Sequence, residues 1–123
     1  MNIPANLLYT KSHEWVEKTS DTTARIGLTD YAQDQLGDLV FINLPAADDA
    51  VTAGETFADA ESVKAVSDIY SPVTGTVSAV NEALLDTPEA INATPYEAFL
   101  IEVSDISEWE TLLDAEAYKA ICE

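Results

Sequence analysis

Short apolar runs separated by turn-forming residues are the feature that most restricts the fold of this chain. Pro45, Gly54 and Pro72 stand between several of these runs. Because many short strands at short spacing are typical of sandwiches and barrel-like folds, we expect a mainly β protein. The candidate strands are 24–28, 39–44, 57–60, 73–80 and 99–103, with an additional early strand at Trp15-Val16.

Only short helices are expected beside the strands. Thr29 can cap a helix that runs through Leu36 and ends at Gly37, the usual C-terminal glycine position. A second helix is predicted where the capping-box pattern of 107–110 precedes Trp109, Leu112 and Leu113 at helical spacing.

A last helix is predicted to start at Asp114, with Ala117 and Ile121 on one face. We expect these C-terminal helices to pack Trp109, Leu112, Leu113 and Ile121 onto the β structure. At 123 residues, the chain has the length of one domain with a modest core.

Charge is strongly one-sided, with 23 acidic residues against five basic ones. Such a surface repels phosphate backbones and anionic lipid, so nucleic acid and membranes are poor partners. The N-terminus lacks the pattern of a secretory signal, and a single cysteine, Cys122, fits a reducing compartment. We therefore expect a cytoplasmic protein in which Cys122 is a tolerated thiol.

The placement of the cations singles out one residue. From Ile26 to Tyr118 the chain carries nineteen Asp or Glu, and Lys64 is the only Lys or Arg. Lys64 lies between two candidate strands in a segment without Gly or Pro, which predicts a tight, ordered hairpin tip. Nothing nearby supplies the special environment that an amine needs to act as a nucleophile, so a Schiff-base or nucleophilic role is not expected. An exposed, rigidly presented amine instead suits acylation by a modifying enzyme.

The residues around Lys64 resemble the lipoyl-attachment signature of the glycine cleavage H-protein family. The matching segments are Glu61-Ser62-Val63-Lys64-Ala65 followed by Ser67 to Pro72 and Gly75, the N-terminal motif Tyr9 to Val16, the helix region Gly27 to Asp38, and the late segments Asn81 to Leu84 and Leu113 to Tyr118. The resemblance covers nearly the whole chain. Biotinyl carriers differ from it because they place methionines beside the modified lysine, where this chain has Val63 and Ala65. The lipoyl domains of 2-oxoacid dehydrogenase complexes usually carry an acidic residue at the position of Val63.

This resemblance implies a barrel-sandwich hybrid of the lipoyl/biotinyl type, with residues 1–123 forming a single lipoyl-carrier domain that has an N-terminal extension and C-terminal helices. It implies lipoic acid bound covalently to Lys64. The residues implied for recognition by the attaching enzyme are Glu61, Val63 and Ala65. The residues implied to line the cleft for the aminomethyl-loaded arm are Ser12, Glu14 and Asp68.

The partners implied are glycine decarboxylase with its pyridoxal phosphate, the tetrahydrofolate-dependent aminomethyltransferase, dihydrolipoamide dehydrogenase and the lipoate-attaching enzyme. The chain is then a monomeric carrier rather than an enzyme, because it shows no pattern for an independent catalytic or metal site. Two alternatives stay open: a lipoyl relay that supplies lipoate to other complexes, and an unmodified interaction module.

The remaining conspicuous residues have structural interpretations. His13 is the only histidine and is expected to be structural, and Trp15 and Trp109 are expected in the core. After Pro95-Tyr96 the chain departs from the family pattern. Glu97-Ala98 stands where the family has a glycine-containing turn, which puts the geometry of this loop in doubt.

Overall fold

The computed structural model describes residues 1–122 and is built mainly from antiparallel strands, which confirms the expected fold class. The strands are β1 (Leu8–Tyr9), β2 (Glu14–Lys18), β3 (Ala24–Leu28), β4 (Leu39–Asn43), β5 (Ala50–Val51), β6 (Thr56–Ser62), β7 (Val66–Tyr70), β8 (Val73–Val80) and β9 (Ile101–Trp109). The helices are α1 (Asp30–Leu36), α2 (Ala83–Asp86), α3 (Ala90–Ala93) and α4 (Ala115–Cys122).

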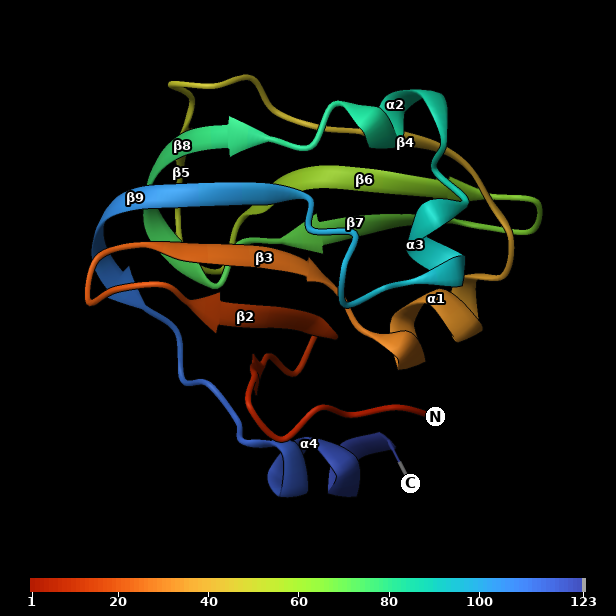
Figure 1. Cartoon of the computed structure of the whole chain (residues 1–123), viewed down its shortest axis with the longest axis horizontal. Helices are drawn as coiled ribbons and strands as arrows, with labels where there is room; N and C mark the ends of the chain where they lie inside the picture. Colours follow the sequence, from red (N-terminus) through yellow and green to blue (C-terminus); the bar gives the residue numbers. More distant parts are fainter. Residues whose placement is uncertain (123) are drawn as a thin grey trace.

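Two sheets divide the strands. The larger has the order β1-β2-β3-β9-β8-β5, and the smaller has the order β4-β6-β7. In Figure 1, α1 and α3 lie at one end of the sheets, α4 lies beyond β2, and the turn between β6 and β7 reaches the outer edge of the molecule. The β6–β7 hairpin is therefore presented away from the bulk of the fold.

The core forms where the inward faces of the two sheets meet. On the small sheet, alternation along each strand turns Ile42, Ala60 and Ile69 inward, where each is 1% exposed or less. On the large sheet, Ile26 and Val103 meet them and are fully buried. Burial of such aliphatic side chains is the main favourable contribution to folding, at roughly 1.5–3 kcal/mol for each fully buried side chain.

Helix α1 follows the prediction made from its end residues. The Thr29 side chain accepts a hydrogen bond from the Ala32 amide at 3.1 Å, which satisfies one of the free donors at the helix start. Gly37 ends the helix with φ +83°, a conformation that costs a residue with a side chain more than it costs glycine. The short helix is thus delimited at both ends by local chemistry.

The helix predicted from the capping-box pattern at 107–110 is wrong, because these residues lie in or just after β9. The strand pairs with β8 in a register that places Val73 opposite Trp109 and Thr74 opposite Glu108. A helix of a few residues is marginal by itself, so the inter-strand hydrogen bonds and the burial of Ile106 override the local pattern. Trp109 is half-buried against the core, as expected, but it reaches the core from a strand.

The last helix exists, but the predicted packing face is wrong. Ala117 and Ile121 are exposed, with Ile121 at 43%, whereas Tyr118 is fully buried. The packed face carries Ala115, Tyr118 and Cys122, because the ring of Tyr118 stacks on Tyr9 with a centroid separation of 4.7 Å. Tyr9 on the N-terminal segment therefore determines which face of α4 is packed. The helical periodicity of α4 alone does not reveal such a distant partner.

The loop at Glu97-Ala98 closes without the glycine of the family pattern. The amides of Glu97 and Ala98 both donate to the Thr94 carbonyl at 3.0 Å. None of the residues in this loop has a positive φ, so a glycine is not required there.

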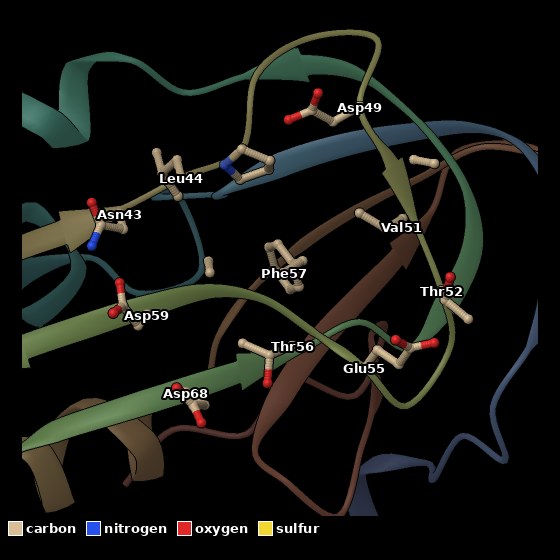
Figure 2. Close-up of a pocket in the computed structure, with 13 residues that line it drawn as sticks. Asn43, Leu44, Asp49, Val51, Thr52, Glu55, Thr56, Phe57, Asp59 and Asp68 are labelled. Atoms are coloured by element: carbon tan, nitrogen blue, oxygen red, sulfur yellow. The ribbon is translucent and has the colours of Figure 1, made fainter.

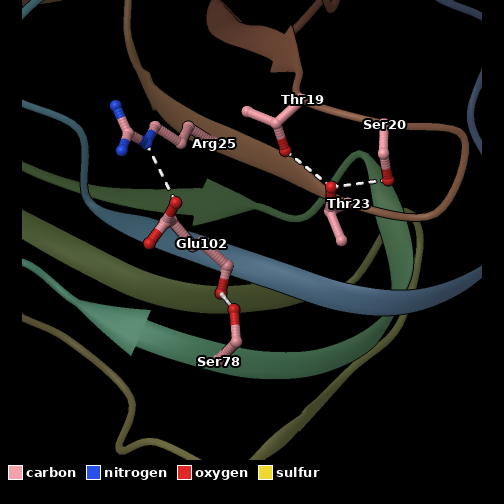
Figure 3. Close-up of polar contacts among 6 residues, drawn as sticks. All are labelled: Thr19, Ser20, Thr23, Arg25, Ser78 and Glu102. Carbon is pink, nitrogen blue, oxygen red and sulfur yellow. Dashed lines mark hydrogen bonds and ion pairs between the residues drawn. The ribbon is translucent and has the colours of Figure 1, made fainter.

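Polar contacts also stabilise the exposed side of the large sheet (Figure 3). Arg25 on β3 donates to Glu102 on β9 at 3.0 Å, and the two residues are direct cross-strand partners. In the β2–β3 turn, the Thr23 hydroxyl contacts the hydroxyls of Thr19 and Ser20 at 2.6 and 2.7 Å. Within residues 1–122, Arg25–Glu102 is the only ion pair.

Candidate functional site

The tip of the β6–β7 hairpin is a tight turn held by one serine. The Ser62 amide donates to the Ala65 carbonyl at 2.8 Å, which closes a loop of only two residues. The Ser62 hydroxyl oxygen accepts from the amides of Lys64 and Ala65 at 3.3 and 3.0 Å. Serine hydroxyls commonly bond nearby backbone in this way, and here the bonds organise a turn that contains no glycine.

Lys64 occupies this tip and is exposed. Its side chain lies over Gly37 at the end of α1, because a Cβ added to Gly37 would lie 3.3 Å from the Lys64 Cε atom. The Val63 amide donates to the Asp38 carbonyl at 3.1 Å and anchors the tip to the same segment. The backbone that carries the Lys64 amine is thus held in place.

The three residues predicted for recognition by an attaching enzyme lie close to Lys64 in the chain, at the end of β6 and in the turn. Glu61 is exposed at the end of β6, Val63 is 71% exposed and Ala65 is exposed. All three side chains are therefore open to a protein that approaches the tip.

Beside the hairpin, the structure brings Ser12, Glu14 and Asp68 together at one cleft of about 260 Å³. Ser12 comes from the loop before β2, Glu14 from the first position of β2, and Asp68 from β7. Residues of α1 complete the wall. They are Tyr31, Ala32, Gln35 and Leu36. Since Leu36 precedes Gly37, the cleft begins beside the glycine over which Lys64 lies.

Glu14 is the most buried polar residue of the cleft, at 1% exposure. Its Oε1 atom accepts hydrogen bonds from the Thr10 hydroxyl at 2.6 Å and from the Ser12 hydroxyl at 2.5 Å. Among residues 1–122, its Oε2 atom has one long hydrogen bond, from the Tyr70 amide at 3.5 Å. One carboxylate oxygen is thus well satisfied, while the other retains capacity for a further donor.

The environment of Glu14 makes its negative charge costly. Burial raises the pKa of Glu14, and the charge of Glu110 raises it further, although the hydrogen bonds from Ser12, Thr10 and Tyr70 oppose both effects. A buried carboxylate in this position is stabilised by a cation, because the cation offsets the lost solvation of the charge.

His13 lies between Ser12 and Glu14 and has an uncommon backbone conformation, with φ +75°. Its Nδ1 atom lies 2.7 Å from the hydroxyl of Tyr118, and the same hydroxyl lies 2.7 Å from Thr29 Oγ1. Burial lowers the pKa of His13. Helix α4 thereby ties the Ser12–Glu14 segment to the start of α1, and the structure agrees with a structural role for His13.

The residues that sequence reasoning missed are those of α1 and the Tyr118 contact. Tyr31 and Gln35 are four positions apart on a helix. Once Thr29 and Gly37 set the ends of α1, their spacing indicates that they share one face. The contact of Tyr118 with His13 had no signal, because it joins residues 105 positions apart. Within residues 1–122, no three His, Cys, Asp or Glu side chains form a group that could hold a metal ion.

The two-sheet β fold thus presents one lysine at a tight hairpin tip, beside a cleft that contains a buried carboxylate. Comparison with known proteins gives the family. The sequence profile described as Glycine cleavage H-protein matches residues 7–123.

Curated relatives and a solved structure agree with this match. A glycine cleavage system H protein of Lachnoclostridium phytofermentans is 59% identical over 97% of this chain and 94% of the relative. One from Escherichia coli is 54% identical over 99% of this chain and 97% of the relative. The crystal structure of a glycine cleavage system H protein from Mycobacterium marinum superposes with a TM-score of 0.91 at 39% identity, covering 96% of this chain and 97% of the other.

The chain belongs to the glycine cleavage H-protein family. Membership makes it the lipoyl carrier of the glycine cleavage system.

Proposed function

We propose that Lys64 carries lipoic acid in amide linkage and that residues 1–123 act as one monomeric carrier domain. The observation that carries the proposal is the position of Lys64. Its amine is exposed on a tight tip, and its side chain lies over Gly37 next to the cleft. The lipoyl group would supply a dithiolane that accepts the aminomethyl group of glycine and delivers it to a second enzyme.

The protein's own part in this function is to present and protect the arm. Glu61, Val63 and Ala65 are the contacts for the attaching enzyme, because they flank Lys64 and are open to solvent. The hydrogen bonds of Ser62 keep the turn in one pose, so that each enzyme meets the same geometry.

Ser12, Glu14 and Asp68 receive the cationic amine at the end of the loaded arm. The free acceptor capacity of Glu14 Oε2 suits an ammonium, and burial strengthens the contact relative to an exposed ion pair. A pure lipoate relay gains nothing from a buried carboxylate beside the arm. This carboxylate therefore favours the glycine carrier over the relay.

The partners that follow are glycine decarboxylase, the aminomethyltransferase, dihydrolipoamide dehydrogenase and the lipoate-attaching enzyme. The carrier has no catalytic site of its own, and its place of action is the cytoplasm. None of the helices within residues 1–122 is long and apolar enough to cross a membrane.

Two measurements test the proposal. Peptide mass mapping after lipoylation should place the added mass on Lys64, and finding it on Lys11 or Lys119 would overturn the assignment. The second compares the lifetime of the aminomethyl-loaded protein with that of its Glu14→Gln variant. Loss of a charge-assisted contact of roughly 1–2 kcal/mol should speed release of formaldehyde and ammonia by about tenfold. Equal lifetimes, with normal lipoylation of both proteins, would favour the relay.

A further inference from the structure

Exposed apolar side chains gather on the small sheet. Within residues 1–122, five of the eight exposed large apolar side chains lie on this sheet or at its hairpin tip. They are Val40 and Phe41 on β4, Val63 at the tip, and Val66 and Tyr70 on β7. None of the five is among the side chains packed against the core. An exposed apolar patch of this kind is typical of a surface that binds another molecule.

The strand register arranges most of this outer face in two rows, and Tyr70 lies beyond them opposite Thr56. Phe41 pairs with Glu61, which pairs with Val66, so an apolar–acidic–apolar row runs across the sheet next to the Lys64 tip. The irregularity between Leu39 and Phe41 leaves Val40 exposed beside Phe41.

The second row carries mostly charge. Asn43 pairs with Asp59, and Asp59 lies directly opposite Asp68. Two like charges in this relation repel each other and destabilise a sheet. Neither side chain has an ion-pair partner within residues 1–122.

This charged row continues into a hollow of about 600 Å³ between the small sheet and the segment 43–52 (Figure 2). Phe57 and Leu44 give the hollow apolar surface, while Asp49, Glu55, Asp59 and Asp68 contribute carboxylates. None of its described lining residues is basic. A lysine or arginine side chain matches this combination, because its stem is apolar and its head is cationic.

We infer that the outer face of the small sheet is the surface on which an enzyme of the lipoyl arm docks. The docking enzyme presents apolar side chains to the row of Phe41 and Val66, and a lysine or arginine to the hollow beside Asp59. Charge complementarity selects this occupant, since the face carries unpaired carboxylates and the whole chain has net charge −18. The identification of the partner as an enzyme that acts on the lipoyl arm rests on the proposed function. The surface itself borders the hairpin tip that carries Lys64.

The surface is tested by measuring how tightly the lipoylated chain binds three enzymes from the same source. They are glycine decarboxylase, the aminomethyltransferase and dihydrolipoamide dehydrogenase. The apolar pair Phe41→Thr and Val66→Thr removes the apolar surface and places threonine, which has high β propensity, in both strands. Its matched control is Leu85→Gln with Ile121→Gln, two exposed apolar positions on α2 and α4. Intact mass must show complete lipoylation of every variant before the comparison is made.

The charge pair is Glu55→Gln with Asp59→Asn. Its control is Glu89→Gln with Glu116→Gln, exposed positions outside the hollow that change the net charge equally. Each face pair should weaken Kd for at least one enzyme by fivefold or more, while the controls stay within twofold. The charge pair should also reduce the salt dependence of Kd. Face variants that match their controls with all three enzymes would overturn the inference.

A probe that involves no enzyme separates this inference from the proposed function. Amide chemical shifts are followed while the chain is titrated with N-acetyl-arginine amide or its uncharged analogue N-acetyl-citrulline amide. The arginine compound alone should shift amides around Phe57 and Asp59, and the charge pair should abolish these shifts. Shifts spread evenly over all acidic segments would contradict a specific surface. If the parent shows these local shifts but lacks glycine-dependent activity, the proposed function fails while the surface stands.

Discussion

The β6–β7 hairpin and the segment around Glu14 lie on two sides of one site, yet they are built in opposite ways. The hairpin tip is exposed, and its turn is organised by local bonds from Ser62. Glu14 is buried and accepts hydrogen bonds from Thr10 and Ser12. The segment that carries it is also held by the hydrogen bond between His13 and Tyr118 of α4.

This difference separates chemical from structural importance. At the tip, the group that a partner must reach contributes little to packing, so its replacement should affect function alone. Around Glu14, the residues that shape the cleft are also part of the fold, so their replacement should affect stability as well. The predictions that follow test this separation.

The largest functional effect is expected from Lys64→Arg. The substitution should abolish lipoylation and all carrier activity, because a guanidinium does not form the amide. Since the side chain is exposed, the free energy of unfolding should change by less than about 0.5 kcal/mol. Intact mass, a glycine-dependent exchange assay and denaturant unfolding measure the three quantities. Residual carrier activity would contradict the view that the exposed tip is essential for function.

Tyr118→Ala should produce the largest loss of stability. The ring is fully buried and stacked on Tyr9, so truncation should cost about 3–5 kcal/mol. Tyr118→Phe keeps the ring but removes the hydroxyl shared with His13 and Thr29, and should cost about 1–2 kcal/mol. Denaturant midpoints rank the two variants. Equal losses would mean that the hydroxyl, rather than the ring, is the main stabilising contact.

Glu14→Gln should have a smaller effect on stability, with a sign that depends on pH. Because folding raises the pKa of Glu14, the stabilisation contributed by its protonated carboxyl is complete below the ordinary value of 4.5 and is lost as pH rises through the folded value. At pH 7 the variant should therefore melt roughly 2–4 °C above the parent, and this advantage should shrink as pH falls towards 4. A variant advantage that grows with acidity would contradict the sign of the shift.

Arg25→Gln should have the smallest effect. The Arg25–Glu102 pair lies on the large sheet with side chains that are 45% and 33% exposed, and exposed pairs contribute little. A small drop in Tm at low salt should disappear at about 1 M salt, where the Debye length is only about 3 Å. A drop that persists at high salt would show that packing of the arginine over Phe99 is the main contribution.

The features that could be predicted from the sequence are those with local causes. Thr29 and Gly37 delimit α1 because a cap hydroxyl and a positive φ are properties of single residues. Short apolar runs between turn residues indicate a mainly β fold for the same reason. Lys64 stands out because no other cation lies between Ile26 and Tyr118, and the motif around it resembles a known family.

Only the tertiary structure decided the features that depend on distant partners. The segment 107–110 has a helical signature but forms the end of β9, because β8 supplies inter-strand hydrogen bonds that a short helix cannot match. The face that α4 packs is selected by Tyr9 and His13, which are more than 100 residues away from Tyr118. The cleft is of the same kind, since it joins α1 to β2 and β7. Local propensity is a property of neighbouring residues, whereas burial and cross-strand pairing exist only after the chain has brought remote segments together.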